Sequence, residues 1–317
     1  MNDIEPLIRY PETFLGLPAA MPGSLRGRRA RAAVLGVPFD CGIHPFRVGA
    51  REGPAAVRRQ SRLIRRFHTL FGDLDAPALL RAADCGDVAV VPGKPAEAFP
   101  RIQRAAAQIL DAGAVPIGVG GDGAVSLPLM RAAGQRYPGL IALHIDSHTD
   151  DYPAPPEDRY NPTTQFTCAA EEGVINAALS WHVGIRGFTF RAGVVARSQA
   201  LGFRVVSIDE LLARGFAQTI AEFRDAAAEH PVYLCWDMDV FDPSVAPGVC
   251  TPAWGGLSAR EGIALMRTLT GLDIVAMDFN TVSPVQDVKG MAAHLCAHMV
   301  AEAMLLLASR LHLAAGT

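Results

Sequence analysis

Two short segments of this chain place acidic side chains and a histidine at alternating positions, directly after apolar runs. The residues are Asp146, His148 and Asp150 in one segment and Asp237 and Asp239 in the other. Side chains two residues apart lie on the same face of an extended strand, so each set can point in one direction. Four carboxylates that crowd together repel one another strongly unless a cation lies among them. The spacing therefore predicts a site for one divalent metal ion or for a pair.

A glycine-rich turn at residues 120–123, with the sequence Gly-Gly-Asp-Gly, follows another apolar run. In open parallel sheets, binding sites form beyond the carboxyl ends of the strands. Because all three segments follow predicted strands, we expect them to meet at one edge of a sheet. We interpret Asp122 as a residue that orders the turn.

Strand-like and helical segments alternate from about residue 32 to the end of the chain. The apolar runs among the predicted strands lack alternation, which is typical of a parallel sheet covered on both faces. The alternation predicts a single three-layer α/β domain at residues 31–317, preceded by an arm at 1–30 that is rich in Pro and Gly. Strands are expected at about 32–37, 83–88, 114–119, 140–145, 181–185, 203–206, 232–236 and 274–277, and helices at about 53–66, 99–110, 126–136, 208–212, 216–228, 258–270 and 288–311.

The composition of the chain argues against several classes of function. A net charge of −3 and a pI near 6.3 give no basic surface for nucleic acid. Five arginines between residues 58 and 66 are expected on an exposed helix face or at a subunit contact. The longest apolar stretch, 299–308, is interrupted by Glu302 and predicts a core helix, so we expect no membrane span. Six scattered cysteines and the lack of a signal peptide predict a cytoplasmic protein with free thiols.

In their order along the chain, these motifs resemble those of the ureohydrolase family, which includes arginase and agmatinase, over about residues 32–310. The segments that carry the resemblance are 40–54, 120–122, 146–150, 237–248, 251–252 and 282–284. The resemblance implies an arginase-like three-layer α/β/α fold with a mainly parallel eight-stranded sheet. It also implies hydrolysis of a guanidine-type C–N bond with two divalent ions, usually Mn²⁺ and in some members Ni²⁺.

The same resemblance implies roles for the five residues of the two acidic segments. Asp146 and Asp237 would bridge the two ions. His148 and Asp239 would complete one metal site. Asp150, together with a histidine after the Gly-Gly-Asp turn, would complete the other, and Asp150 is also the candidate catalytic residue.

This chain departs from the family pattern at three positions of the expected active site. Gly123 stands where the family has the metal-binding histidine. Asn161 is expected to stand where the family has a histidine that transfers protons, and Thr281 where it has a glutamate that binds the guanidinium group. The second metal site is therefore incomplete, and a site with a single Ni²⁺ or Mn²⁺ ion, or with none, stays open.

Two functions follow from these departures. In the first, the chain lacks a complete active site and supports a homologous active subunit in a trimer or hexamer. In this respect it resembles the degenerate subunit of metformin hydrolase, a nickel-dependent complex. In the second, it is a competent amidinohydrolase with a rebuilt, mononuclear metal site and an N-substituted guanidine as substrate.

The remaining polar candidates have simpler interpretations. His144 and His182 lie within predicted strands and are expected to be core residues. Asp151 is expected to be a solvated neighbour of the metal-binding segment. His294 and His298 are four residues apart on one helix, which we interpret as a packed or interface face.

Overall fold

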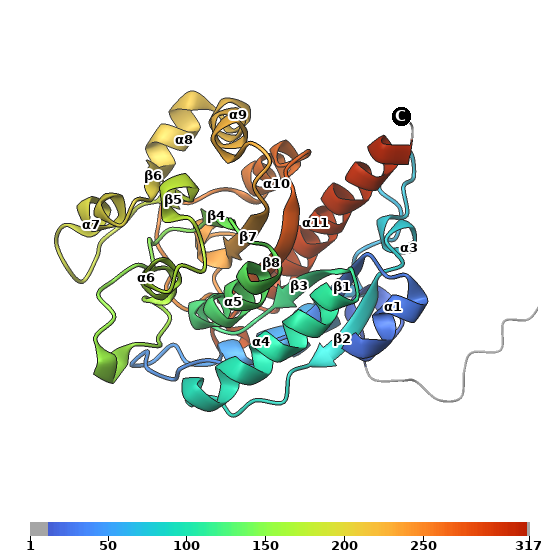
Figure 1. Ribbon diagram of the computed structural model, residues 1–317, viewed down its shortest axis with the longest axis horizontal. Helices are drawn as coiled ribbons and strands as arrows, with labels where there is room; N and C mark the ends of the chain where they lie inside the picture. The colour runs from blue at the N-terminus through green and yellow to red at the C-terminus, as the bar shows by residue number, and fades with distance from the viewer. Residues whose placement is uncertain (1–11, 316–317) are drawn as a thin grey trace, which may run out of the picture.

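In the computed structural model, which describes residues 12–315, the strands form one sheet between two layers of helices (Figure 1). The eight strands have the order β2-β1-β3-β8-β7-β4-β5-β6, and every pairing is parallel. The strands are β1 (Ala32–Gly36), β2 (Ala83–Asp87), β3 (Val115–Val119), β4 (Ile141–Ile145), β5 (Trp181–Ile185), β6 (Arg204–Ser207), β7 (Val232–Asp237) and β8 (Ile274–Asn280). The predicted three-layer fold with its eight-stranded sheet is confirmed.

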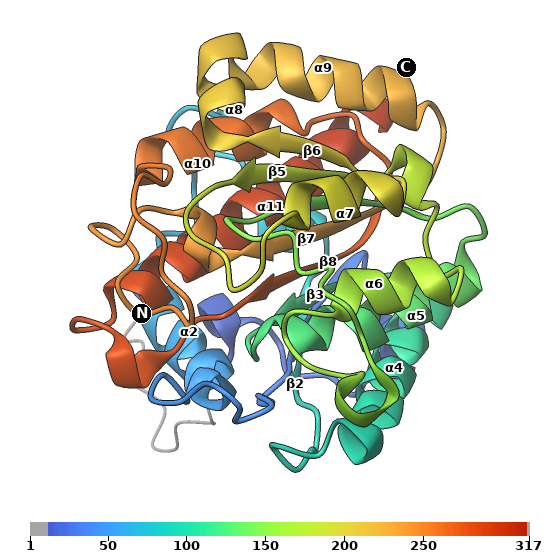
Figure 2. The same cartoon turned by 90° about the vertical axis from the view of Figure 1, so that its left-hand side faces the viewer.

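The two faces of the sheet are covered by different sets of helices (Figures 1 and 2). On one face lie α4 (Pro95–Asp111), α5 (Ser126–Arg136) and α6 (Gln165–Glu171). On the other lie α2 (Gly53–Ser61), α9 (Phe216–Ala227), α10 (Ala259–Thr268) and α11 (Met291–Ala315). The remaining helices are α1 (Leu25–Arg28), α3 (Ala76–Leu79), α7 (Val194–Ala200) and α8 (Ile208–Arg214).

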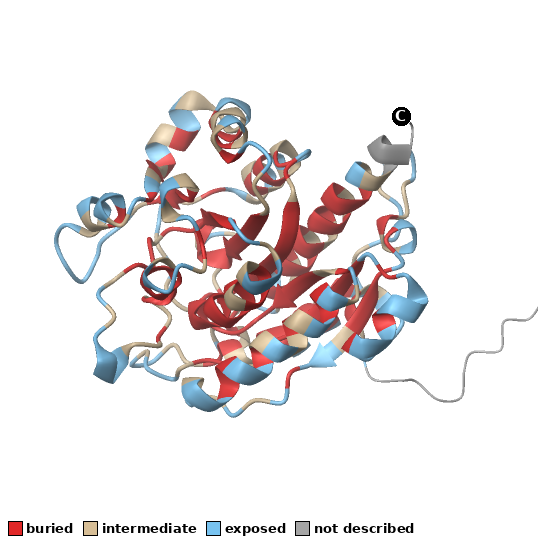
Figure 3. Cartoon of the chain, viewed as in Figure 1, coloured by how far each residue is buried: buried red, intermediate tan, exposed pale blue. Residues whose placement is uncertain are grey.

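Burial on both faces explains why the strands lack alternation. Every residue of β1, β4, β5, β7 and β8 is buried, and these strands form the interior in Figure 3. Successive side chains point to opposite faces, so Val34 joins the core under α11 while Leu35 joins the core under α4. Strands β1, β4, β7 and β8 therefore supply both hydrophobic cores.

Helix α11 is a core helix of this fold. By length and composition its segment Met291–Leu311 could cross a membrane. However, 67% of the most apolar part of this segment is buried inside the protein. This burial agrees with the predicted core helix at 299–308. Glu302, which interrupts the apolar stretch, is itself buried and pairs with Arg267.

The predicted helix at 53–66 is too long, because α2 ends at Ser61. The expected exposure of its arginines is also wrong for Arg58, which is 7% exposed. Two carboxylates of the neighbouring strand β2 neutralise it: Arg58 donates to Asp84 at 2.8 Å and also binds Asp87. All six cysteines are free.

The expected arm at 1–30 falls partly outside the described residues, which begin at residue 12. From there to residue 30 the chain includes short helical turns. Phe14 and Leu25 of these turns are fully buried against the domain.

Candidate metal centre

Four neighbouring strands deliver the candidate site residues to one edge of the sheet. In the order β3-β8-β7-β4, the strands end directly before Gly120, before Thr281, at Asp237 and before Asp146. The register pairs Asp237 with Asn280 and the preceding Trp236 with Ile145, so the two acidic segments lie side by side. The turn after β3 needs glycine, because a Cβ on Gly120, whose φ is +89°, would lie 2.4 Å from the ring of Pro54.

The acidic segments turn directly after the strands end at Ile145 and Asp237, so the extended spacing that the sequence predicted does not continue through them. Strand β4 stops at Ile145, and Asp150 has a left-handed backbone with φ of +50°. Asp239 lies in a short 3₁₀ turn, Met238–Val240. Side chains close both turns, since Asp146 accepts from the N–H of His148 at 2.7 Å and Asp237 accepts from the N–H of Asp239 at 2.7 Å. Local hydrogen bonding, rather than strand pleating, therefore brings these side chains together.

Three of the predicted metal ligands converge closely. Ligand atoms of Asp146, His148 and Asp239 all lie within 4.8 Å of one another. The His148 Nδ1 atom is 3.1 Å from a carboxylate oxygen of Asp239 and 3.5 Å from one of Asp146. Ser147 supports the group, because its hydroxyl donates to Asp239 at 2.6 Å. One imidazole and two carboxylates form a donor set that suits a divalent transition metal.

The protonation of the site reflects carboxylates that are buried and crowded. Burial, followed by the charges of neighbouring aspartates, raises the pKa values of Asp150 and Asp237 well above the ordinary range and that of Asp239 to a smaller extent. Burial acts in the same direction on Asp146, but nearby imidazoles hold its pKa below the ordinary value. Burial disfavours charged His148, yet Asp239 and Asp146 raise its pKa well above 6.5. In the metal-free protein, the protons that these carboxyl groups retain relieve the repulsion among them. A divalent cation would relieve the same repulsion in place of the protons, so these residues fit such an ion.

A row of buried polar residues lies behind the site. His144 Nε2 is 2.7 Å from the Asp146 carboxylate, and His144 Nδ1 is 2.9 Å from His182 Nδ1. Both histidines are at most 1% exposed, as expected for core residues. The expectation that Asp151 is solvated is wrong, because it is buried, accepts from Thr149 at 2.7 Å and lies 3.7 Å from His182. This row supports Asp146 from the side away from the cavity.

The space beside Gly123 is filled by Gln165, the first residue of α6. A Cβ on Gly123 would lie 2.7 Å from the Gln165 amide nitrogen and 3.2 Å from the Asp150 carboxylate. Gln165 is 1% exposed and donates to Asp150 at 2.6 Å. Gln165 was not among the predicted site residues, because α6 is short and no sequence motif includes it.

Residues 161 and 281 are placed differently from one another. Thr281 is 5% exposed, lines the cavity and donates its hydroxyl to Asp237. Asn161 turns away from the cavity, because its amide nitrogen donates to the backbone of Asp158 at 2.9 Å and its amide oxygen accepts from Thr163. The cavity is lined at this point by Pro162 and Thr163 instead. No imidazole of this segment therefore faces the cavity.

The site opens into a cavity of about 280 Å³ with a largely apolar outer wall. That wall includes Ile43, Pro45, Phe46, Val48 and Phe190. Phe46 is 78% and Phe190 is 90% exposed, so both rings stand at the mouth. Arg47 also lines the cavity, but its guanidinium donates to the carbonyl oxygens of Pro247 and Val249, at 3.0 and 2.6 Å.

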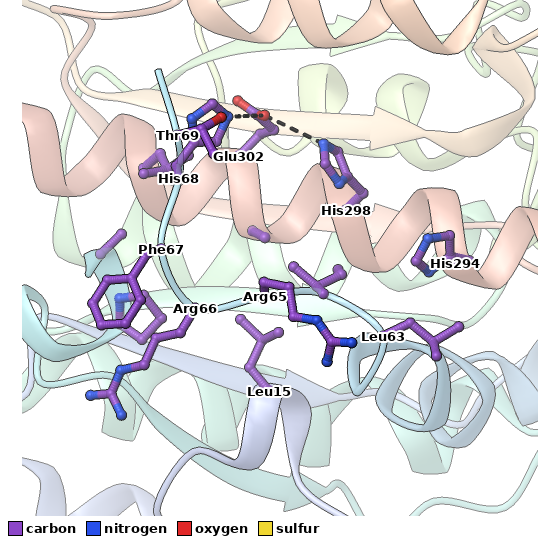
Figure 4. Close-up of a pocket in the computed structure, with 15 residues that line it drawn as sticks. Leu15, Leu63, Arg65, Arg66, Phe67, His68, Thr69, His294, His298 and Glu302 are labelled. Carbon is purple, nitrogen blue, oxygen red and sulfur yellow. Dashed lines mark ion pairs between the residues drawn. The ribbon is translucent and has the colours of Figure 1, made fainter. Parts of the chain in front are cut away.

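A second polar cluster lies on α11, outside this cavity (Figure 4). It lines a separate cavity of about 290 Å³, into which His294 also faces. His68 and His298 approach Glu302 from two sides, at 3.6 and 3.4 Å (Figure 4). Arg267 donates twice to Glu302, at 2.9 and 2.6 Å, so this carboxylate already has a cationic partner. His298 therefore belongs to a packed ion-pair cluster, whereas His294 lines the same cavity without contacting Glu302.

Comparisons with known proteins agree on one family. The model described as "Arginase: Arginase family" matches residues 30–306. Guanidinopropionase of Pseudomonas aeruginosa is 37% identical over 303 residues, which cover 93% of this chain and 91% of that protein. Mitochondrial agmatinase of Gallus gallus is 32% identical over 276 residues, 87% of this chain and 81% of that protein. The structure of proclavaminate amidino hydrolase from Streptomyces clavuligerus superposes with a TM-score of 0.88 at 33% identity, covering 95% of this chain and 98% of that one.

Proposed function

Because the chain belongs to the arginase family, we propose that it is a metal-dependent hydrolase of a C–N bond in a guanidine-type small molecule. The observation that carries this proposal is the convergence of Asp146, His148 and Asp239, of which His148 and Asp239 line a cavity of about 280 Å³. The names of the relatives support the substrate class, since guanidinopropionase and agmatinase are named for guanidine compounds.

The ion in this proposal is a single Mn²⁺ or Ni²⁺. Asp146, His148 and Asp239 would hold it, with Asp237 beside them. Both ions accept carboxylate and imidazole ligands, so the donor set suits either. When bound, such an ion supplies Lewis acidity and makes water a nucleophile at neutral pH.

Proton transfer and substrate binding then depend on the residues of this chain. Asp150 lines the cavity beside the metal ligands and is the candidate for proton transfer. Thr281 does not replace the lost guanidinium-binding carboxylate, because it has no charge and its hydroxyl is donated to Asp237. Binding of the substrate therefore depends on the cavity walls more than on an ion pair at residue 281.

The substrate in this proposal carries an apolar group on a guanidine nitrogen. Phe46 and Phe190 supply aromatic surface at the mouth for such a group. The arginines near the cavity are already engaged, Arg47 with carbonyl oxygens and Arg51 with Asp40. Neither arginine is therefore free to bind the carboxylate group of a substrate at this wall.

A second candidate function is support of a homologous active subunit in a trimer or hexamer. The observation that favours it is that three positions of the expected active site lack the functional groups that the family resemblance implies. Residue 123 offers no side chain, the Asn161 amide is turned away from the cavity, and Thr281 offers no charge. Losses of this kind lower a reaction rate by orders of magnitude when the groups act together.

Both functions are tested on the chain purified alone and after co-expression with a homologous subunit that has a complete ligand set. Metal content is measured by elemental analysis. Hydrolysis is measured with a panel of guanidines that differ in their N-substituents. Hydrolysis of an N-alkylated guanidine by the isolated, metal-loaded chain supports the first function. Turnover that appears only in the mixed complex supports the second.

A further inference from the structure

We infer that Gln165 sets the metal stoichiometry of this site, by filling the space of a further ligand and by engaging the carboxylate of Asp150, which otherwise lies within ligand distance of His144 and Asp146. This inference rests on the proposed metal site and specifies how many ions that site accepts. It predicts one ion per chain.

The first argument is steric. A Cβ on Gly123 would lie 2.7 Å from the Gln165 amide nitrogen, which is closer than real Cβ atoms approach. It would also lie 3.0 Å from the backbone carbonyl oxygen of Pro162. Any side chain at position 123 therefore requires the Gln165 amide to move from its place beside Asp150.

The second argument concerns Asp150. Its carboxylate accepts a hydrogen bond of 2.6 Å from Gln165, and both residues are buried, at 7% and 1% exposure. A hydrogen bond to a carboxylate in a dry site is strong. Gln165 thus gives Asp150 the partner that a cation would otherwise provide, without adding a positive charge. An ion at this position would have to displace that hydrogen bond.

The third argument is that Gln165 is held in place by the backbone. It is the first residue of α6, and the N–H of the next residue, Phe166, donates to the carbonyl oxygen of Asp150 at 3.1 Å. Helix α6 packs against α5, and Phe166 is fully buried. The start of α6 is therefore tied to the loop of Asp150, which keeps the amide aimed at the carboxylate.

One atom of Gln165 points to an alternative. Its Oε1 atom is buried and has no hydrogen-bond partner among the described residues. Buried polar groups are seldom left unpaired. If the amide reversed, Oε1 would itself become a metal ligand, and the chain would hold two ions with Gln165 as part of the second site.

The wild-type protein and three variants distinguish these possibilities. The variants are Gly123→His, Gln165→Ala and the double variant Gly123→His/Gln165→Ala. Each is loaded with Mn²⁺ or with Ni²⁺ and dialysed, and ions per chain are counted by elemental analysis and by calorimetric titration. We expect one ion in each of the first three chains, since the added histidine alone collides with Gln165. We expect two in the double variant. Circular dichroism and thermal unfolding verify that each chain is folded.

A near-isosteric variant, Gln165→Glu, extends the test in case the double variant does not fold. It keeps the shape of the side chain but replaces the donor with a carboxylate, so we expect its metal content to rise above one ion per chain. Two ions in wild type that fall to one in Gln165→Ala would overturn the inference and make Gln165 a ligand. A folded double variant, or Gln165→Glu, that stays at one ion would also overturn it. Metal absent from wild type and from every variant would instead contradict the proposed metal site itself.

Discussion

Thr281 donates its hydroxyl to Asp237, and it does so from a left-handed backbone with φ of +65°. This conformation is rare for a β-branched residue and persists where surrounding contacts enforce it. Two hydrogen bonds do so here: the Thr281 N–H donates to Gly121 at 2.8 Å, and its carbonyl accepts from Cys250 at 3.1 Å. The end of β8 is thus tied to the glycine turn and to the loop before residue 251, and its side chain is aimed at a proposed metal ligand.

This contact predicts a loss of stability in Thr281→Val. Valine keeps the shape of threonine but leaves the buried Asp237 carboxylate without one of its donors. We expect the free energy of unfolding of the metal-free protein to fall by about 1–3 kcal/mol. Urea unfolding measures it. Thr189→Val is the matched control, because Thr189 is exposed, and its effect should stay within about 0.5 kcal/mol. Equal effects of both variants would contradict the buried role of Thr281.

His148 is the only imidazole in the converging group, so His148→Ala should weaken binding of Mn²⁺ or Ni²⁺ by at least about 100-fold. Calorimetric titration gives the affinities. His298→Ala is the control, since His298 is also a partly buried histidine beside a carboxylate but lies in the separate cluster on α11 (Figure 4). Its metal affinity should equal that of wild type. Comparable losses in the two variants would place the metal elsewhere.

Metal binding should strengthen as pH rises. The pKa values of Asp150, Asp237 and His148 are raised in the metal-free protein, so these groups keep their protons to higher pH than usual. An ion that binds to Asp237 or His148 must displace those protons, and acidification therefore favours the metal-free state. Titrations in two buffers with different heats of ionisation count the protons released. An affinity that is constant between pH 6 and 8, with no proton release, would contradict this account.

The aromatic mouth of the cavity predicts a preference for N-alkylated guanidines. Phe190→Ala removes apolar surface that such a substituent would contact, so kcat/KM for an N-alkylated guanidine should fall by about 10-fold. The value for unsubstituted guanidine should change little. Phe188→Ala is the control, because Phe188 is fully exposed and does not line the cavity. A uniform loss for all substrates in Phe190→Ala would argue for a general structural role instead.

The central strands of the sheet could be predicted from the sequence, because a strand that is buried on both faces is a continuous run of apolar residues. Strand β5 (Trp181–Ile185) has the predicted bounds, and its residues are all buried. The conformation of the segment after β4 was harder to predict, because its polar residues alternate as they would in a strand. There the side chain of Asp146 binds the backbone of His148 and turns the chain. Such local side-chain to backbone bonds compete with strand pairing and leave no distinct sequence pattern.

Two residues of the site were missed for a different reason. Gln165 acquires its role from contacts with Gly123 and Asp150, residues 42 and 15 positions away in the chain. Asp151 was expected in solvent, yet the hydroxyl groups of Thr149 and Ser198 bind it in the interior. Both depend on long-range packing, which spacing along the chain does not reveal.

The central claim is that this chain binds one divalent ion in its own site and uses it to hydrolyse a guanidine. The most direct measurement is the metal content and turnover of the chain purified without any homologous subunit, with His148→Ala beside it. We predict one Mn²⁺ or Ni²⁺ per wild-type chain, hydrolysis of an N-alkylated guanidine, and the loss of both in His148→Ala. A folded wild-type chain that retains no metal after loading and turns over no guanidine would contradict the claim, and activity restored only by a homologous subunit would then assign the chemistry to that partner.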